Sequence, residues 1–283
     1  MFQYLSILTN RLKDVYPLDE ARAIARWVVD EWRDQQLSER EVDRQLPSVV
    51  ERLCRHEPVQ QIFGHTFWNG LRLNVTKDTL IPRPETAELV EWIEDDAAKW
   101  ANVSSCSPLK TTDEYKKNTL HVLDIGTGSG CIAVALAVHH PEWAVSALDK
   151  SDKALNVARK NADENKVSIS FLKADILHDL DGEKFQYDIV VSNPPYICES
   201  ERLSMDANVV DYEPSMALFV SDSDPLLFYR KIAELRLGRH LYFEINEAFG
   251  MQVVELLQHL GYKNVQLKND IYGKPRFVYG ALD

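Results

Sequence analysis

A chain of 283 residues is long enough for one large domain, or for a domain of about 200 residues that carries a smaller one. The charged fraction of 27% and the hydrophobic fraction of 45% are near the averages of globular proteins, which argues against a disordered or fibrous chain. The net charge of −12 lies almost wholly after residue 75, because residues 1–75 hold 10 Lys and Arg against 11 Asp and Glu. An acidic main domain argues against non-specific binding along a nucleic-acid backbone, which depends on Lys and Arg.

Membrane, export and metal signals are missing from the sequence. The longest uncharged run, residues 125–141, opens with a glycine-rich stretch and is shorter than the roughly 20 apolar residues of a membrane span. The first 15 residues lack an apolar core followed by a small-residue cleavage site, so we expect a cytoplasmic location. The histidines show no pair at helical metal-ligand spacing, and we predict no metal site. We also predict free thiols, because no two of the four cysteines form a close pair: Cys54, Cys106, Cys131 and Cys198.

The first residues predict a small helical domain, residues 1–59. One buried helix face is indicated by the spacing of Ala21, Ile24, Ala25, Val28, Val29 and Trp32. A second helix is predicted to start at the capping box formed by Ser38 and Glu41, and Pro47 is expected to break it or to open a new helix. Residues 60–85 are predicted to form a linker that holds a β-hairpin around Asn69-Gly70, followed by a proline-rich segment.

The rest of the chain, residues 86–283, has the pattern of an α/β domain. Apolar runs typical of strands alternate with helix-length segments at residues 120–125, 143–148, 168–172, 187–192 and 240–245. This alternation predicts a doubly wound, mostly parallel sheet. The last two runs, 262–267 and 275–280, have too little chain between them for a crossover helix and predict a hairpin, which brings the sheet to seven strands. Residues 102–118 are rich in Ser, Thr and Lys and are predicted to be a surface loop.

A glycine-rich turn, Asp124-Ile125-Gly126-Thr127-Gly128-Ser129-Gly130, follows the first strand of this domain. It lacks the Lys-Ser/Thr of a phosphate-binding P-loop, since Cys131 follows its last glycine. It also lacks the Gly or Ala at position 131 that would complete the dinucleotide-binding motif G-x-G-x-x-G/A. Ser129 does not fit the nucleophile motif G-x-S-x-G of α/β-hydrolases, because position 127 is Thr instead of Gly. The G-x-G-x-G spacing resembles the first motif of class I S-adenosylmethionine-dependent methyltransferases. A tight structural turn is the alternative interpretation.

Two acidic residues follow the next two strands. Asp149 ends the second strand, where a carboxylate can accept hydrogen bonds from both hydroxyl groups of a ribose. The alternative for Asp149 is a helix cap before Ser151. Asp175 is placed to accept a hydrogen bond from the adenine amino group, although Asp is also common in turns. The resemblance implies an aromatic residue just after this acid in many relatives, whereas this chain has Ile176.

The fourth strand ends in Asn193-Pro194-Pro195-Tyr196, on the same sheet edge as the glycine-rich turn. Methyl transfer to an amide or ring amino group requires both N–H bonds to be held so that the nitrogen lone pair is aimed at the methyl carbon. The Asn193 side-chain oxygen and the Pro194 carbonyl can each accept one N–H, and consecutive prolines keep the loop stiff. Tyr196 is expected to provide a flat wall for a planar group.

These motifs, taken with residues 80–86, 211–218 and 273–276, resemble the release factor glutamine methyltransferases over nearly the whole chain. The resemblance implies a class I methyltransferase fold. It also implies methylation of the glutamine side-chain nitrogen in the Gly-Gly-Gln loop of class I peptide-chain release factors, which act in translation termination. Asn193, Pro194, Pro195 and Tyr196 would be catalytic. The residues expected to bind S-adenosylmethionine are Gly126, Thr127, Gly128, Ser129, Gly130, Asp149, Asp175, Ile176 and Asn193.

Two other functions remain as alternatives. Amino-methyltransferases of nucleic-acid bases use an Asn-Pro-Pro-Tyr motif in the same way. They also need a basic surface that binds the nucleic acid, and the charge count does not indicate one. A non-enzymatic scaffold would tolerate damage to Asn193 or to the glycine-rich turn, and both are intact. We expect a monomer without stable nucleic-acid binding. One departure from the family pattern is the segment Glu244-Ile245-Asn246-Glu247, in which most bacterial relatives carry glycine soon after the glutamate.

Overall fold

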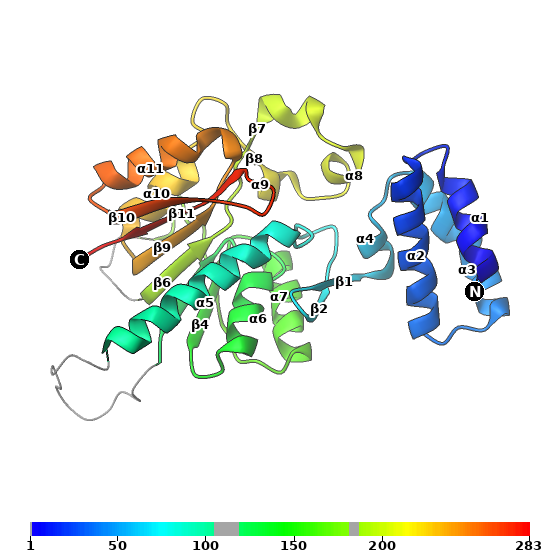
Figure 1. The fold of residues 1–283 in the computed structure, drawn as a ribbon, viewed down its shortest axis with the longest axis horizontal. Helices are drawn as coiled ribbons and strands as arrows, with labels where there is room; N and C mark the ends of the chain where they lie inside the picture. The colour runs from blue at the N-terminus through cyan, green and yellow to red at the C-terminus, as the bar shows by residue number, and fades with distance from the viewer. Residues whose placement is uncertain (1, 105–118, 181–186) are drawn as a thin grey trace. The chain divides into compact units, whose positions relative to one another are not determined.

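The computed structural model describes residues 2–104, 119–180 and 187–283. The chain forms two compact units, which Figure 1 draws together without fixing their relative position. The first unit comprises residues 1–65 and 206–212, and the second comprises residues 66–205 and 213–283. A short segment from the later part of the chain therefore belongs to the N-terminal unit.

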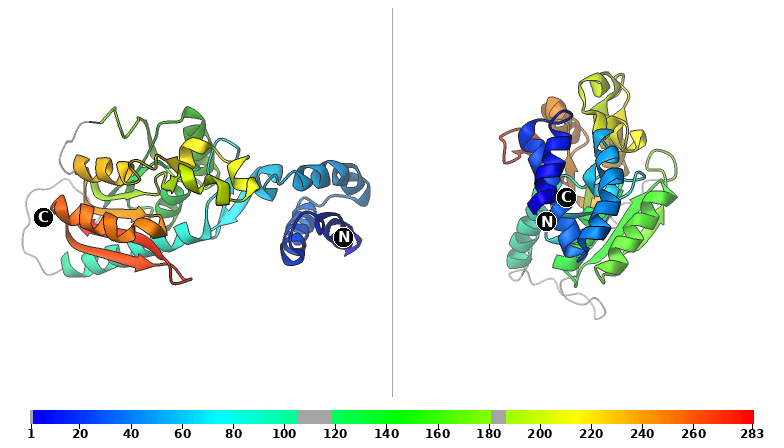
Figure 2. Two further views of the ribbon diagram at one scale, coloured as in Figure 1. Left: turned by 90° about the horizontal axis from the view of Figure 1, so that it is seen from above. Right: turned by 90° about the vertical axis from the view of Figure 1, so that its right-hand side faces the viewer.

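The first unit is a small helical bundle around its own apolar core (Figure 2, blue). The predicted stripe is confirmed, because Ala21, Ala25, Val28 and Trp32 are fully buried in it. The indole nitrogen of Trp32 donates to Gln45 Oε1 at 3.0 Å, so the polar atom of this large core residue is satisfied. The helices of this unit are α1 (Phe2–Leu12), α2 (Leu18–Asp34), α3 (Glu39–Cys54), α4 (Val59–Phe63) and the short α8 (Ala207–Val210).

Helix α3 corrects one expectation about Pro47. The helix begins after Ser38 as predicted, and the Ser38 amide donates to Glu41 Oε2 at 2.9 Å. The prediction that Pro47 breaks the helix or opens a new one is wrong, since α3 continues through it to Cys54. Proline removes one backbone hydrogen bond from a helix interior, and burial of Val42, Val49 and Leu53 along one face offsets that loss.

The hairpin between the two predicted domains is confirmed. Strands β1 (His65–Trp68) and β2 (Leu71–Asn74) form a two-stranded sheet. Asn69 and Gly70 join them with φ values of 48° and 74°, the left-handed conformation that two-residue hairpin turns favour.

The second unit is built on a seven-stranded sheet of order β10-β11-β9-β6-β3-β4-β5, which confirms the predicted fold class. The strands from β9 to β5 are parallel, whereas β11 runs antiparallel to both β9 and β10. The closing hairpin is thus confirmed as well. The strand bounds are β3 (His121–Ile125), β4 (Ala144–Asp149), β5 (Ser170–Lys173), β6 (Tyr187–Ser192), β9 (Gly238–Glu244), β10 (Lys263–Asn269) and β11 (Pro275–Ala281).

Both faces of the sheet are covered by helices (Figures 1 and 2). Successive side chains of a strand point to opposite faces, and each face has its own core. In β6, Ile189 and Val191 belong to one core and Val190 to the other. The first core includes residues of α5 (Pro84–Ser104), α6 (Cys131–His139) and α7 (Asp152–Glu164). The second core includes residues of α10 (Leu227–Leu235) and α11 (Gly250–His259).

Two parts of the α/β unit differ from the expectation or extend it. Helix α5 continues to Ser104, so the predicted loop starts later than residue 102, and residues 105–118 lie outside the described residues. The chain after β6 forms small elements that the sequence pattern did not indicate. These are β7 (Ile197–Cys198), η1 (Glu199–Ser204), α9 (Ser215–Leu218), β8 (Phe219–Val220) and, further on, η2 (Glu247–Phe249).

Candidate active site

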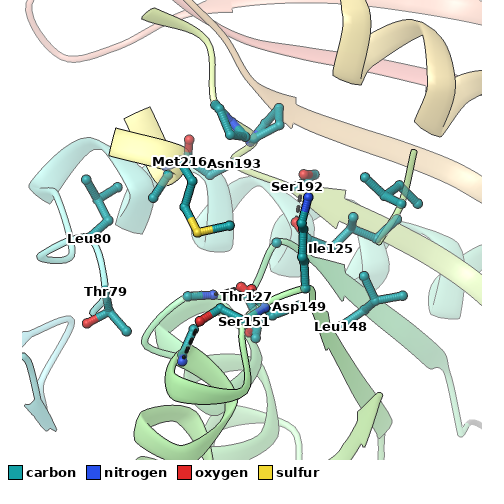
Figure 3. Close-up of a pocket in the computed structure, with 18 of the residues that line it drawn as sticks. Thr79, Leu80, Ile125, Thr127, Leu148, Asp149, Ser151, Ser192, Asn193 and Met216 are labelled. Carbon is teal, nitrogen blue, oxygen red and sulfur yellow. Dashed lines mark hydrogen bonds between the residues drawn. The ribbon is translucent and has the colours of Figure 1, made fainter. Parts of the chain in front are cut away.

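A cavity of about 330 Å³ opens at the carboxyl ends of the parallel strands, which is a typical size for a small-molecule site. It lies where the strand order reverses between β3 and β6, the position at which open α/β sheets bind ligands. Loops after β3, β4, β5 and β6 line it, so four separate motifs of the sequence meet there. Figure 3 shows Thr127, Asp149 and Asn193 around this space.

The glycines of the turn after β3 have two different functions. Gly126, Gly128 and Gly130 all have positive φ, at 71°, 56° and 80°. A Cβ on Gly126 would meet no atom within 4 Å, and one on Gly128 would meet only the Gly126 carbonyl at 4.0 Å. Both residues line the cavity, so their missing side chains leave room for a ligand close to the backbone.

Gly130 has a packing function instead. A Cβ there would lie 2.9 Å from the Cβ of Ala158, in α7. Gly130 therefore allows the start of α6 to approach α7 closely. In the described chain it does not line the cavity, whereas Thr127 and Ser129, which the sequence also singled out, do.

Asp149, at the end of β4, organises the turn around it. Its two carboxylate oxygens accept backbone amides from Gly128 at 2.9 Å and from Ser151 at 2.8 Å. The N-cap of α7 is Ser151, whose hydroxyl accepts from the Ala154 amide, so the alternative of Asp149 as the helix cap does not hold. Burial raises the pKa of Asp149, and the amide hydrogen bonds oppose that rise. Each oxygen keeps a lone pair for a further donor.

Asp175 and Ile176 form the wall after β5. Asp175 Oδ2 pairs with Lys150 Nζ at 2.8 Å, and Oδ1 accepts the Leu177 amide at 3.0 Å. Despite partial desolvation, the Lys150 ammonium beside it keeps the pKa of Asp175 below its usual value. Ile176 is buried and gives the cavity an aliphatic surface where the resemblance implied an aromatic one.

The Asn-Pro-Pro-Tyr segment follows β6 directly. Asn193, Pro194 and Pro195 line the cavity. Tyr196 does not line it within the described chain, and its hydroxyl donates instead to Glu244 Oε1 at 3.1 Å. The structure thus brings Asn193 and both prolines next to the glycine-rich turn, while Tyr196 contacts β9.

The opposite wall comes from two segments that the sequence pattern did not assign to a site. Thr79 and Leu80 come from the chain before α5, and Met216 comes from α9, with its sulfur directed into the space (Figure 3). Glu213 joins the two segments, because its carboxylate binds the Arg83 guanidinium at 2.7 Å and the Ile81 amide at 3.1 Å. In the sequence, only the family resemblance connected residues 80–86 and 211–218 with function, and Thr79 lies outside both ranges.

Further polar residues hold the loops in place. The Nδ2 group of Asn161, in α7, donates to the Ser129 carbonyl at 2.8 Å and to the Asn74 carbonyl at 3.0 Å. The glycine-rich turn is thereby joined to strand β2. Asparagine inside a helix gives no distinctive sequence signal, so Asn161 could be found only from the structure.

Two ionisable groups near the turn are strongly perturbed. Asp124 is buried under the turn, where its Oδ2 accepts from Thr127 Oγ1 at 2.6 Å, and desolvation raises its pKa to about 7. Its Oδ1 makes no hydrogen bond of ordinary geometry in the described parts of the chain, although the nearby Ala133 amide of α6 offsets part of the rise in pKa. Cys131 lines the cavity, and desolvation together with the nearby Asp124 raises the pKa of its thiol to about 12.

This arrangement fits an amino acid and a nucleoside better than a phosphate ligand. The open space at Gly126 and Gly128 admits a bulky group, and the Asp149 carboxylate can accept hydrogen bonds from hydroxyl groups.

No group of three His, Cys, Asp or Glu residues that could hold a metal ion occurs among the described residues. Within the same residues, no helix is long and apolar enough to cross a membrane.

The sheet and the cavity together define the class I methyltransferase fold. Solved structures with this fold include the N-terminal domain of human METTL16 in complex with SAH, with a TM-score of 0.51 at 19% identity, covering 80% of this chain and 82% of that chain. The METTL16 catalytic domain with the MAT2A 3′UTR hairpin 1 has a TM-score of 0.55 at 19% identity, covering 75% and 74% of the two chains. A family model described as "Methyltransferase small domain" matches residues 108–211.

Relatives that match most of the chain identify the family more narrowly. The release factor glutamine methyltransferase of Bacteroides thetaiotaomicron is 37% identical over 294 residues, covering 98% of this chain and 99% of the relative. That of Flavobacterium psychrophilum is 47% identical over 239 residues, covering 83% and 79%. This chain belongs to the release factor glutamine methyltransferase family.

Proposed function

We propose that this protein transfers a methyl group from S-adenosylmethionine to the side-chain amide nitrogen, N5, of a glutamine in the Gly-Gly-Gln loop of class I peptide-chain release factors. The observation that carries the proposal is the position of Asn193, which lines the same cavity as Gly126, Gly128 and Asp149. Family membership supports the choice of glutamine and of the release factor as acceptor.

S-adenosylmethionine supplies an electrophilic methyl group on a sulfonium centre. Gly126, Thr127, Gly128 and Ser129 would hold it through the backbone of the turn, and Asp149 would accept from its ribose. Asp175 and Ile176 would flank its adenine. All of these residues line the cavity, whereas Gly130, which we also predicted to bind the cofactor, would act through the packing of α6.

The residues after β6 would position the acceptor. An amide nitrogen is a poor nucleophile because its lone pair is delocalised into the carbonyl. The Asn193 Oδ1 would accept one N–H of the glutamine amide and the Pro194 carbonyl the other, which stabilises the positive charge that develops on nitrogen. Pro195 keeps this loop stiff, and Tyr196 would support it from the side of β9.

We further propose that the helical domain, residues 1–59, docks the protein substrate, that residues 60–85 act as the linker and that residues 86–283 form the methyltransferase domain. In this proposal the enzyme acts as a monomer in the cytoplasm. Phe2 is 91% exposed on the helical unit, so its side chain is accessible to a partner protein. Phe2→Ser should raise KM for the release factor, while Met251→Ser, at an exposed methionine of the other unit, should not. An unchanged KM in Phe2→Ser would remove this side chain from the docking surface.

The experiment that tests the proposed reaction offers radiolabelled S-adenosylmethionine with three acceptors. These are a class I release factor, the same factor with its loop glutamine changed to asparagine, and structured nucleic acid. We expect label only in the unmodified factor, because asparagine is one methylene shorter and a displacement of about 1 Å can cost on the order of a hundredfold in rate. Equal labelling of both factors would show that another residue is the target. Label only in nucleic acid would support base methylation instead.

A further inference from the structure

Three side chains form a hydrogen-bonded series that begins at the wall of the cavity and ends at a residue outside it. Asn193 Nδ2 donates to Thr86 Oγ1 at 3.3 Å, and Thr86 Oγ1 donates to Glu244 Oε2 at 2.7 Å. Thr86 lies in the first turn of α5, and Glu244 is the last residue of β9. Thr86 and Glu244 are 2% and 1% exposed, so water does not compete for these bonds.

The proton of the Thr86 hydroxyl decides the direction of this series. A threonine hydroxyl has one proton, and an ionised carboxylate can only accept hydrogen bonds. Because Thr86 gives its proton to Glu244, its oxygen can only accept from Asn193. The amide NH₂ of Asn193 must therefore face Thr86, since the amide oxygen in that place would bring two acceptors together. The Oδ1 atom is left to face the other way.

The second oxygen of Glu244 is also in use. Tyr196 donates its hydroxyl proton to Glu244 Oε1 at 3.1 Å, so Glu244 accepts from a hydroxyl on each side. The Arg276 guanidinium contributes a favourable charge and Glu85 an unfavourable one. Burial raises the pKa of Glu244 above its ordinary value, and the Thr86 and Tyr196 hydrogen bonds and the Arg276 charge offset part of that rise. A glutamine at this position would have one oxygen and one NH₂ group in place of the two carboxylate oxygens. The NH₂ group would then face the hydroxyl proton of either Thr86 or Tyr196, so that two donors would meet.

We infer that Thr86 and Glu244 are positioning residues that set which end of the Asn193 amide faces the acceptor. The inference rests on the proposed function, in which Asn193 Oδ1 accepts from the glutamine N–H. Reversal of the Asn193 amide would place a donor against that N–H and remove the acceptor. Thr86 lines the cavity beside Asn193, while Glu244 acts only through Thr86 and Tyr196.

Two substitutions separate the effect of the Thr86 hydroxyl group from the effect of the side-chain shape. Thr86→Ser keeps the hydroxyl and loses a methyl group, whereas Thr86→Val keeps the shape and loses the hydroxyl. The control is Thr66→Val, the same change at a buried threonine of β1 that does not line the cavity. For each variant, kcat and KM are measured with a release factor, and S-adenosylmethionine affinity is measured by calorimetry.

We expect Thr86→Val and Glu244→Gln to lower kcat by about tenfold or more, with cofactor affinity within about twofold of wild type. Thr86→Ser should retain kcat within about threefold, and Thr66→Val should match wild type. Wild-type kcat in Thr86→Val would overturn the inference. An equal loss in Thr86→Ser and Thr86→Val would also overturn it, because the methyl group would then be what matters.

A second measurement needs no acceptor substrate. The side-chain amide signal of Asn193 in a ¹H–¹⁵N spectrum should move in Thr86→Val and Glu244→Gln and stay close to its wild-type position in Thr86→Ser. An unmoved signal in Thr86→Val would refute the orientation by Thr86 whatever the substrate is. Failure of the wild-type enzyme to label a release factor would refute the proposed function and leave this spectral test standing.

Discussion

The Ser192 hydroxyl donates to the Ile125 carbonyl at 2.7 Å, and this bond joins the last residues of two neighbouring parallel strands (Figure 3). Ser192 is fully buried and directly precedes Asn193. Ile125 directly precedes Gly126. The bond therefore fixes the position of the Asn-Pro-Pro-Tyr segment relative to the glycine-rich turn.

Replacement of Ser192 by Ala should affect both stability and rate. Loss of one buried hydrogen bond that leaves a carbonyl without its partner should lower the free energy of unfolding by about 1 to 3 kcal/mol. We also expect a lower kcat, because the two loops are no longer held together at their origin. Urea denaturation and turnover measurements test this, with Ser170→Ala at an exposed position of β5 as the control. Equal behaviour of the two variants would show that the bond does not position the loops.

Asn193→Ala should leave cofactor affinity largely unchanged and reduce the methylation rate by about a hundredfold or more, since a preorganised polar contact to the reacting group is lost. Asn193→Asp should fall between wild type and Ala, because a carboxylate still accepts an N–H but faces Thr86 with a second acceptor. Single-turnover assays with saturating cofactor measure both. Wild-type turnover in the Ala variant would refute the acceptor role.

Asp149→Ala should weaken S-adenosylmethionine binding by roughly 1 to 3 kcal/mol through the lost hydrogen bonds to a buried ribose. Titration calorimetry with the cofactor or its demethylated product measures this change. Asp152→Ala is the matched control, because Asp152 lies three residues later, is exposed and pairs with Lys173. If both variants bind the cofactor equally well, Asp149 is not part of the site.

Gly130→Ala should destabilise the protein through two separate effects. Its φ of 80° is unfavourable for Ala, and the new Cβ would lie 2.9 Å from that of Ala158. We expect a loss of about 2 to 4 kcal/mol in the free energy of unfolding. Gly273→Ala isolates the backbone effect, because Gly273 has a φ of 79° and open space around it.

The double variant Gly130→Ala, Ala158→Gly should recover part of this loss, since it removes the opposing methyl group. A coupling energy near zero in that double-mutant cycle would contradict the packing role of Gly130.

The buried Asp124 predicts a dependence of stability on pH. Its pKa is about 7 in the folded chain against an ordinary value of 3.8, so the folded state binds the proton more tightly than the unfolded state. The stability that Asp124 contributes is therefore fully present below about pH 4 and is lost as the pH rises to about 7. This loss amounts to at most about 4 kcal/mol.

Asp124→Asn removes the ionisation and retains an acceptor for Thr127. The difference in free energy of unfolding between variant and wild type should move in favour of the variant between pH 4 and pH 8, which denaturation at several pH values would measure. A difference that is independent of pH would show that Asp124 does not titrate in this range.

The sheet and the two loop motifs at its edge could be predicted from sequence because they depend on local patterns. Alternating apolar runs gave the seven strands, and the glycine-rich turn and the Asn-Pro-Pro-Tyr segment each stand directly after one of them. Pro47 was predicted wrongly because a local rule about proline was applied without knowledge of the core that holds α3 together.

What the sequence could not reveal depends on contacts between distant residues. Thr86 and Asn193 are 107 positions apart, and Asn161 reaches Asn74 across 87 positions. In the sequence, residues 206–212 lie between two parts of the α/β unit, but they belong to the helical unit. There the Tyr212 carbonyl accepts a hydrogen bond from Gln61 Nε2 at 2.9 Å. None of these pairings follows from periodicity or from a spaced motif.

The raised pKa of the Cys131 thiol bears on whether the enzyme is methylated by its own methyl donor. A sulfonium methyl donor reacts readily with thiolates, and Cys131 lines the cavity in which we propose that donor binds. The pKa of about 12 keeps this thiol protonated near neutral pH, and the thiol is a far weaker nucleophile than the thiolate. In the proposed reaction, desolvation of this side chain would protect the protein from alkylating itself and would leave the methyl group for the acceptor that we propose Asn193 holds.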